Sequence, residues 1–128
     1  MKTQFEFKSP SFPPVPGEEE QINPGRFGKR LADFLADELA KRGYKVGTPF
    51  PEDWGWQLDI ANESFPLWIG CGNVDGTEDE FLCFIEPSKP FVRKWLTKIP
   101  TTDVVNRLSA TVEAVLRESG RVTDLQAQ

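Results

Sequence analysis

The chain has no histidine and only two cysteines among its 128 residues. Without histidine, the Ser-His-Asp and Cys-His arrangements of nucleophilic catalysis are excluded, and so is histidine-ligated zinc. Two cysteines cannot supply the four ligands of an all-cysteine zinc site. No catalytic or cofactor motif stands out elsewhere. We therefore expect no catalytic residues, no metal and no cofactor, and we favour a protein that is not an enzyme.

Long apolar runs and an excess of positive charge are also lacking. The longest apolar run is a handful of residues, too short for a membrane-spanning helix, and Met1–Phe7 lacks the apolar core of a signal peptide. The net charge of −5 and the pI near 4.8 argue against nucleic acid and against an anionic membrane as partners. Two cysteines without an export signal indicate the reducing cytoplasm.

The length predicts a single domain over residues 1–128. Ser9–Gly17 holds four prolines, which favours an extended chain over a helix. We therefore expect residues 1–22 to form an extended, Pro-rich arm, with a weak strand at Phe5 and Phe7. We expect residues 121–128 to be a frayed tail.

Two segments have the three- and four-residue apolar spacing of helices. In the first, Asn23 is a suitable N-cap, Pro24 suits the first helical position and Gly43 follows the end. The second begins at Thr101 or Thr102. The two apolar stripes are Phe27, Leu31, Phe34, Leu35 and Leu39, and Val104, Val105, Leu108, Val112, Val115 and Leu116.

Between these helices the sequence changes to the period-two alternation of strands. We expect one strand over residues 44–50 and three more over 56–61, 67–72 and 81–86, followed by a short amphipathic piece over 91–96. Turn positions set the register of the three central strands. The predicted opposite pairs are Trp56 and Cys71, Leu58 and Ile69, Ile60 and Leu67, Cys71 and Cys83, Ile69 and Ile85, and Gly70 and Phe84.

This order of elements predicts an α+β fold. It is a two-layer sandwich: a mostly antiparallel sheet of four to five strands, with the two main helices on one face. The alternation then gives one wholly apolar face, which the helices cover. The other face mixes polar groups such as Asp59 with Trp68, Leu82 and Phe84.

What covers this second face decides the function. The N-terminal strand, or the Pro-rich segment with Phe12 and Val15, could fold across it, since exposed apolar patches of this size are uncommon on monomers. Alternatively, the face is a homodimer interface or binds a protein partner. We therefore interpret Trp68, Leu82, Phe84 and Asp59 as candidate binding residues.

A second candidate site consists of carboxylates beside aromatic rings. Glu52 and Asp53 precede Trp54 in a turn, and Asp59 or Glu86 could complete a pair for acid–base chemistry. With Trp54 and Trp56 this resembles a cleft that binds a small molecule or a carbohydrate, and could belong to a hydrolase. The competing interpretation is a turn-forming Asp and a solvated Glu.

Four weaker signals favour structural interpretations. Cys71, between two glycines, has no base to activate it and is best interpreted as buried. The oxygen-rich loop 73–80 does not have the spacing of a calcium site. Residues 25–28 could hold an anion at a helix start. The basic residues near Trp95 suggest side chains that lie along an aromatic ring.

Four segments, at residues 25–28, 52–56, 67–73 and 81–87, read GRFG, EDWGW, LWIGCGN and FLCFIEP. Together they resemble a family of small bacterial proteins to which no activity or catalytic residues are assigned. The resemblance covers about residues 23–116. It implies a compact bacterial cytoplasmic domain and adds no functional residue.

We therefore expect a non-enzymatic protein that uses the aromatic sheet face for protein–protein contact or self-association. The alternatives are the carbohydrate or small-molecule binder and, by analogy with small acidic bacterial proteins, a toxin-neutralising immunity protein.

Overall fold

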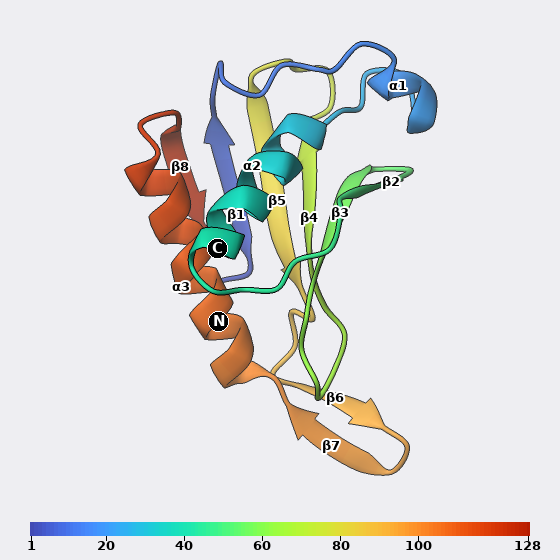
Figure 1. Ribbon diagram of the computed structural model, residues 1–128, viewed down its shortest axis with the longest axis vertical. Helices are drawn as coiled ribbons and strands as arrows, with labels where there is room; N and C mark the ends of the chain where they lie inside the picture. Colours follow the sequence, from blue (N-terminus) through green and yellow to red (C-terminus); the bar gives the residue numbers. More distant parts are fainter.

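The computed structural model describes all residues, 1–128. Its elements are β1 (Gln4–Lys8), α1 (Glu18–Gln21), α2 (Lys29–Lys41), β2 (Phe50–Glu52), β3 (Gly55–Ile60), β4 (Leu67–Asn73), β5 (Glu80–Glu86), β6 (Phe91–Lys94), β7 (Thr97–Pro100), α3 (Thr102–Glu118) and β8 (Thr123–Ala127). Six strands form one antiparallel sheet in the order β2-β3-β4-β5-β1-β8, and β6 and β7 form a separate pair. Both long helices lie on one face of the large sheet (Figure 1). The predicted two-layer α+β sandwich is confirmed, but its sheet has six strands and not the expected four to five, because the C-terminal residues add a strand.

The register of β3, β4 and β5 is the predicted one, since all six expected pairs occur. The two faces follow from it. Side chains that point toward the helices are buried along β5, while the alternate side chains of that strand are partly exposed. Leu31, Leu35 and Leu39 of α2 are fully buried, and so is most of the α3 stripe. The core therefore lies between this sheet face and the two helices.

The start of α2 differs from the prediction. The helix begins at Lys29, and Asn23 is not its N-cap: the Asn23 side chain donates instead to the carbonyl oxygen of Asp53 at 2.8 Å. Gly28 occupies the N-cap position, and a glycine has no side chain with which to cap the helix. The capping groups come from elsewhere in the chain, which local sequence spacing does not reveal.

Two predicted elements between the helices also change. The strand expected over 44–50 is reduced to an isolated bridge between Val46 and Ile60, and the edge strand β2 follows it. Pro51 is tolerated in β2 because an edge strand needs fewer backbone donors. The amphipathic piece over 91–96 is a β-hairpin, whose two-residue loop is Trp95-Leu96.

Both chain ends join the sheet, which corrects two predictions. Residues 121–128 are not a frayed tail, because β8 pairs with β1 at the sheet edge. The strand expected at Phe5 and Phe7 is confirmed as β1, which lies between β5 and β8. The rest of the N-terminal arm is not extended throughout, because Glu18–Gln21 form a short helix. None of the three helices has the length and apolar character needed to cross a membrane.

Candidate functional site

The sheet face opposite the helices carries a cluster of three aromatic rings. Trp68 on β4 and Phe84 on β5 point to this face, and Trp54 reaches it from the turn between β2 and β3. The ring centroids are 5.9 Å apart for Trp54 and Trp68, 5.2 Å for Trp54 and Phe84, and 5.6 Å for Trp68 and Phe84. All three residues are only partly buried. We refer to Trp54, Trp68 and Phe84 as the aromatic platform.

Gly70 allows the platform to form. It pairs with Phe84 across the strands, and a Cβ atom at Gly70 would overlap the Phe84 ring. The ring therefore lies over the glycine, as expected for an aromatic that covers a strand glycine. From this position it contacts both tryptophans, so the glycine of β4 determines where the platform lies.

Carboxylates surround the platform. Asp59 and Glu86 are the cross-strand neighbours of Trp68 on either side, and Glu52 and Asp53 precede Trp54 in its turn. Asp59 accepts a hydrogen bond from the Gln57 side chain at 2.9 Å. None of these four carboxylates forms an ion pair with a lysine or arginine of the chain. The face therefore combines partly exposed aromatic surface with unpaired negative charge.

The structure joins the two candidate sites of the sequence analysis into one surface. Asp59, Trp68, Leu82 and Phe84 share the open face, as the predicted register requires. Because Trp54 stacks on Trp68, the turn with Glu52 and Asp53 belongs to the same surface. The spacing of residues in the sequence does not reveal this contact between Trp54 and Trp68, because it joins the β2–β3 turn to β4.

Trp56 does not belong to this surface. Its side chain points to the core face and is 3 % exposed, with the Lys29 ammonium 5.7 Å from its ring centroid. The indole nitrogen has no hydrogen-bond partner. The expectation that Trp56 helps to bind a ligand is therefore wrong, because strand alternation places it opposite Cys71 on the buried side.

The N-terminal segment does not cover the open face, which corrects one of the alternatives above. Phe5 and Phe7 point into the core from β1, in line with Cys83 and Phe81. Phe12 is 2 % exposed and packs against Phe34 of α2, with ring centroids 5.4 Å apart. The segment extends the sheet and fills its helical side, so the aromatic platform remains uncovered.

The negative charge at the start of α2 is supplied by the chain itself. Glu18 is 1 % exposed, and its Oε2 accepts hydrogen bonds from the backbone N–H groups of Gly28 and Lys29, both at 2.7 Å. Its Oε1 accepts a third from Val15 at 2.8 Å. A carboxylate at a helix N-terminus satisfies free donors and the helix dipole. The Glu18 carboxylate therefore occupies the place that an external anion would take at the N-terminus of α2.

The acidic loop 73–80 is a structural turn. Asn73 is buried and its side chain accepts from Phe27 N–H at 3.0 Å, while it donates to the carbonyl oxygens of Gly25 and Thr77. It thereby fastens the segment before α2 to the β4–β5 loop. No group of three or more acidic, cysteine or histidine side chains in the structure could hold a metal ion.

The two cysteines lie in the core and are not linked. They face one another across β4 and β5, and both are fully buried. Burial raises the pKa of the Cys83 thiol to about 12. Burial, with smaller contributions from Cys83 and Asp33, holds the pKa of Cys71 well above its ordinary value. The interpretation of Cys71 as a buried residue is confirmed.

The basic residues near Trp95 lie on the β6–β7 hairpin, which the sequence analysis did not predict. The signal was present, because Phe91–Lys94 and Thr97–Pro100 flank a two-residue loop and Pro90 precedes them. Trp95 and Leu96 at the tip are the most exposed large apolar residues of the chain, at 91 % and 85 %.

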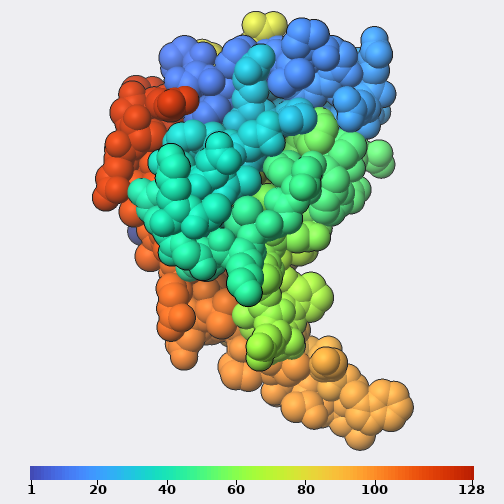
Figure 2. Space-filling model, in the orientation of Figure 1, coloured from blue at the N-terminus to red at the C-terminus, as the bar shows by residue number.

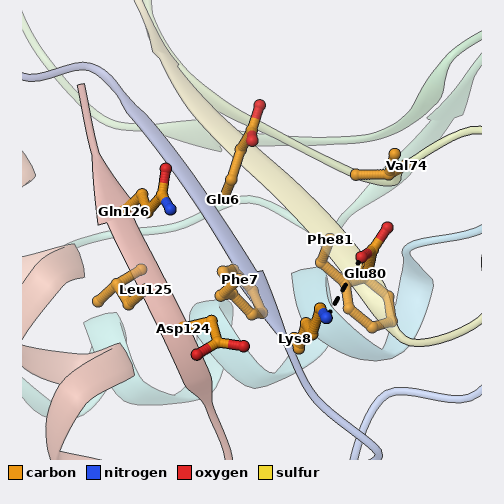
Figure 3. A pocket seen from close by; sticks show the side chains of 9 residues that line it. All are labelled: Glu6, Phe7, Lys8, Val74, Glu80, Phe81, Asp124, Leu125 and Gln126. Atoms are coloured by element: carbon orange, nitrogen blue, oxygen red, sulfur yellow. Dashed lines mark ion pairs between the residues drawn. The ribbon is translucent and has the colours of Figure 1, made fainter.

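The principal clefts lie away from the aromatic platform. One, of about 470 Å³, opens beside β8, where the register of β1 and β8 shifts (Figure 3). Its walls include Glu6, Gln126 and the Lys8–Glu80 ion pair, whose charged atoms are 3.7 Å apart. Trp54, Trp68 and Phe84 line none of four clefts, which have volumes of about 470, 410, 350 and 520 Å³. The platform thus lies outside these four clefts.

Comparison of the chain with protein-family models, with curated proteins and with solved structures finds no match.

Proposed function

We propose that this protein is a non-enzymatic interaction protein whose open sheet face binds another protein chain. The observation that carries the proposal is the uncovered platform of Trp54, Trp68 and Phe84, surrounded by unpaired carboxylates. Tryptophan is enriched at binding hot spots, where one or two large side chains contribute most of the affinity.

The geometry of the face supports a protein partner more than a small ligand. Small-molecule sites are concave and enclose most of the ligand. Here the aromatic rings pack on one another over Gly70, and they line none of the four clefts described above. The alternative of a carbohydrate or small-molecule binder also loses Trp56, which is buried. We further propose that the interaction takes place in the cytoplasm.

The test is to change the centre of the platform and to measure association. Trp68→Glu introduces a charge into the apolar surface, and we expect it to abolish binding to the partner or to a second copy. Arg107→Glu is the control, because Arg107 is exposed on α3 and forms no ion pair. Circular dichroism establishes that both variants are folded.

Solution mass by light scattering and capture of partners from native lysate are measured for wild type, for these two variants, and for Phe84→Ser and Asp59→Lys, which change two further positions of the face. Association that Trp68→Glu removes and Arg107→Glu retains supports the proposal. Association that survives Trp68→Glu, Phe84→Ser and Asp59→Lys alike contradicts it.

A further inference from the structure

The β6–β7 hairpin projects from the body of the protein. Its strands pair only with one another, and it extends beyond the end of the large sheet (Figures 1 and 2). Val92 and Ile99 on one of its faces are half-buried, near a cleft of about 520 Å³ shared with the β3–β4 loop. The tip lies farthest from the core, so Trp95 and Leu96 contribute little to its packing.

The backbone at the tip is unfavourable for its residue. Trp95 has φ of 60°, in the left-handed region that glycine and asparagine normally occupy in two-residue hairpin loops. An L-residue with a large side chain pays a conformational cost there. Folding of the single chain does not explain a tryptophan at this position, whereas contact with another surface does.

The hairpin also carries the opposite charge to the rest of the chain. From Pro87 to Thr102 there are four cations, Lys89, Arg93, Lys94 and Lys98, and no carboxylate. None of the four forms an ion pair. Because the whole chain has a net charge of −5, the remainder has −9. The apolar tip is thus flanked by unpaired positive charge.

The open sheet face has the matching properties. Asp59 and Glu86 are unpaired and lie beside Trp68, at the end of the sheet from which the chain enters the hairpin. Cations beside tryptophan rings are attracted by the ring face as well as by the carboxylates. A surface of aromatic rings and carboxylates is therefore complementary to a tip with Trp95, Leu96 and two or three cations.

We propose that the hairpin tip docks on the open sheet face of a second copy of this chain. The inference rests on the proposed function and names its partner. Because the tip and the part of the face with Asp59, Trp68 and Glu86 lie toward the same end of the molecule, a two-fold axis can satisfy both contacts at once and close a dimer. An anionic membrane fits less well, because it would repel the body with its charge of −9.

The size of the contact indicates a weak dimer. A buried tryptophan covers roughly 200 Å², so two tips and the two surfaces beneath them cover on the order of 1,000 Å². This is the lower end of specific interfaces. Since unpaired charges take part, we expect added salt to weaken the association. Mass is therefore measured by sedimentation from about 10 µM to about 1 mM, at low and high salt.

The first test compares the tip with the face. We expect Trp95→Ser and Trp68→Glu each to raise the dimer dissociation constant at least about 30-fold, the range of a hot-spot residue. Trp95 is 91 % exposed, so its substitution leaves the monomer folded. A dimer that Trp68→Glu disperses but Trp95→Ser does not overturns the hairpin inference and leaves the proposed function standing. A wild-type chain that is monomeric throughout also overturns the inference, and the lysate experiment then decides the proposed function.

The second test exchanges the charges. One variant has an acidic tip, Arg93→Glu with Lys94→Glu, and the other has a basic face, Asp59→Lys with Glu86→Lys. Alone, each brings like charges together and we expect a monomer. Mixed, each tip meets an oppositely charged face, and we expect a heterodimer with both contacts restored.

A matched control separates this pairing from general attraction between the two variants. Arg30→Glu with Arg107→Glu changes the net charge equally, but on exposed residues of α2 and α3. We expect no heterodimer of this control with the basic-face variant beyond that formed by wild type. Equal pairing of both acidic variants with the basic-face variant overturns the inference, as does a mixture that stays monomeric.

Discussion

Several single residues in this protein form hydrogen bonds with, or make room for, groups that are distant in the sequence. Glu18 supplies the capping carboxylate of α2, Asn73 holds the segment before that helix, and Gly70 makes room for Phe84. Each is a buried polar group with its hydrogen bonds formed, or a glycine at a close approach. Such positions have few acceptable substitutes, because an unpaired buried donor costs free energy.

Replacing Glu18 tests this at one position. Glu18→Ala leaves the N–H groups of Val15, Gly28 and Lys29 without their acceptor, so we expect the free energy of unfolding to fall by about 3 kcal/mol. The neighbouring Glu19 is exposed, and we expect Glu19→Ala to change it by less than about 0.5 kcal/mol. Urea denaturation of both variants measures the difference. Equal effects would contradict the capping role.

The buried thiols predict a loss of stability at alkaline pH. Since burial raises the pKa of Cys83 to about 12, the folded protein keeps this proton above pH 9 while the unfolded chain releases it. The unfolded state then binds fewer protons, and the free energy of unfolding falls as pH rises. At pH values below the ordinary thiol pKa, the Cys83 thiol is protonated in both states, and its contribution to the free energy of unfolding is fully present.

Unfolding in urea at several values between about pH 8 and about pH 11 tests this expectation. We expect the wild-type curve to fall more steeply above pH 9 than that of Cys83→Ala, by about 1.4 kcal/mol per pH unit. Groups other than Cys71, whose pKa is raised mainly by burial and to a smaller extent by Cys83, titrate alike in both proteins and so cancel in the comparison. Parallel curves would show that Cys83 is not protected from ionisation.

At the scale of elements, the two edges of the sheet are arranged in ways that limit pairing with other chains. β8 covers the free edge of β1, and the backbone of Gln128 exchanges hydrogen bonds with that of Gln4. An uncovered strand edge is prone to pair with other chains. On the other edge, β2 is three residues long and contains Pro51, which limits such pairing.

Removing β8 shows whether the C-terminal strand contributes to the fold. Deleting residues 122–128 removes the β1–β8 ladder and the half-buried Leu125 and Ala127. We expect the free energy of unfolding to fall by roughly 2–4 kcal/mol and the β1 amides to exchange faster with solvent. Gln126→Ala keeps the ladder and serves as the control. A frayed tail would be removed without a change in stability.

At the scale of the whole molecule, apolar surface and charge are unevenly distributed. The core side of the sheet is closed by two helices, while the opposite side leaves an aromatic platform with carboxylates around it. The hairpin projects from the body (Figure 2), and the segment from Pro87 to Thr102 that contains it carries four cations without an ion pair. Two surfaces of opposite charge, each with tryptophan, therefore lie on one small chain, and this division suits a protein that binds partners.

The four tryptophans report on this arrangement. Trp56 is 3 % exposed, Trp54 and Trp68 are half-buried, and Trp95 is 91 % exposed. We expect acrylamide to quench Trp95 fluorescence most readily in the monomer, so that Trp95→Phe removes the most red-shifted and most accessible part of the emission. Trp56→Phe removes a blue-shifted part that the quencher hardly reaches. The same accessibility in both variants would contradict the projecting hairpin.

The sequence by itself determined the fold class, the two main helices and the register of β3, β4 and β5. These follow from local rules: apolar spacing marks the helix stripes, strand alternation assigns the faces, and short turns set the pairing. It also identified Trp68, Leu82 and Phe84 as residues of the second face.

Only the tertiary structure decided what lies on that face and at the sheet edges. Glu18 reaches α2, β8 reaches β1, and Trp54 reaches Trp68 because the path of the whole chain brings them together. No local period encodes such contacts, since they depend on burial and hydrogen bonding between distant segments. Whether Phe5 and Phe7 cover the second face or enter the core was decided in the same way, by a pairing with β5 that spans most of the chain.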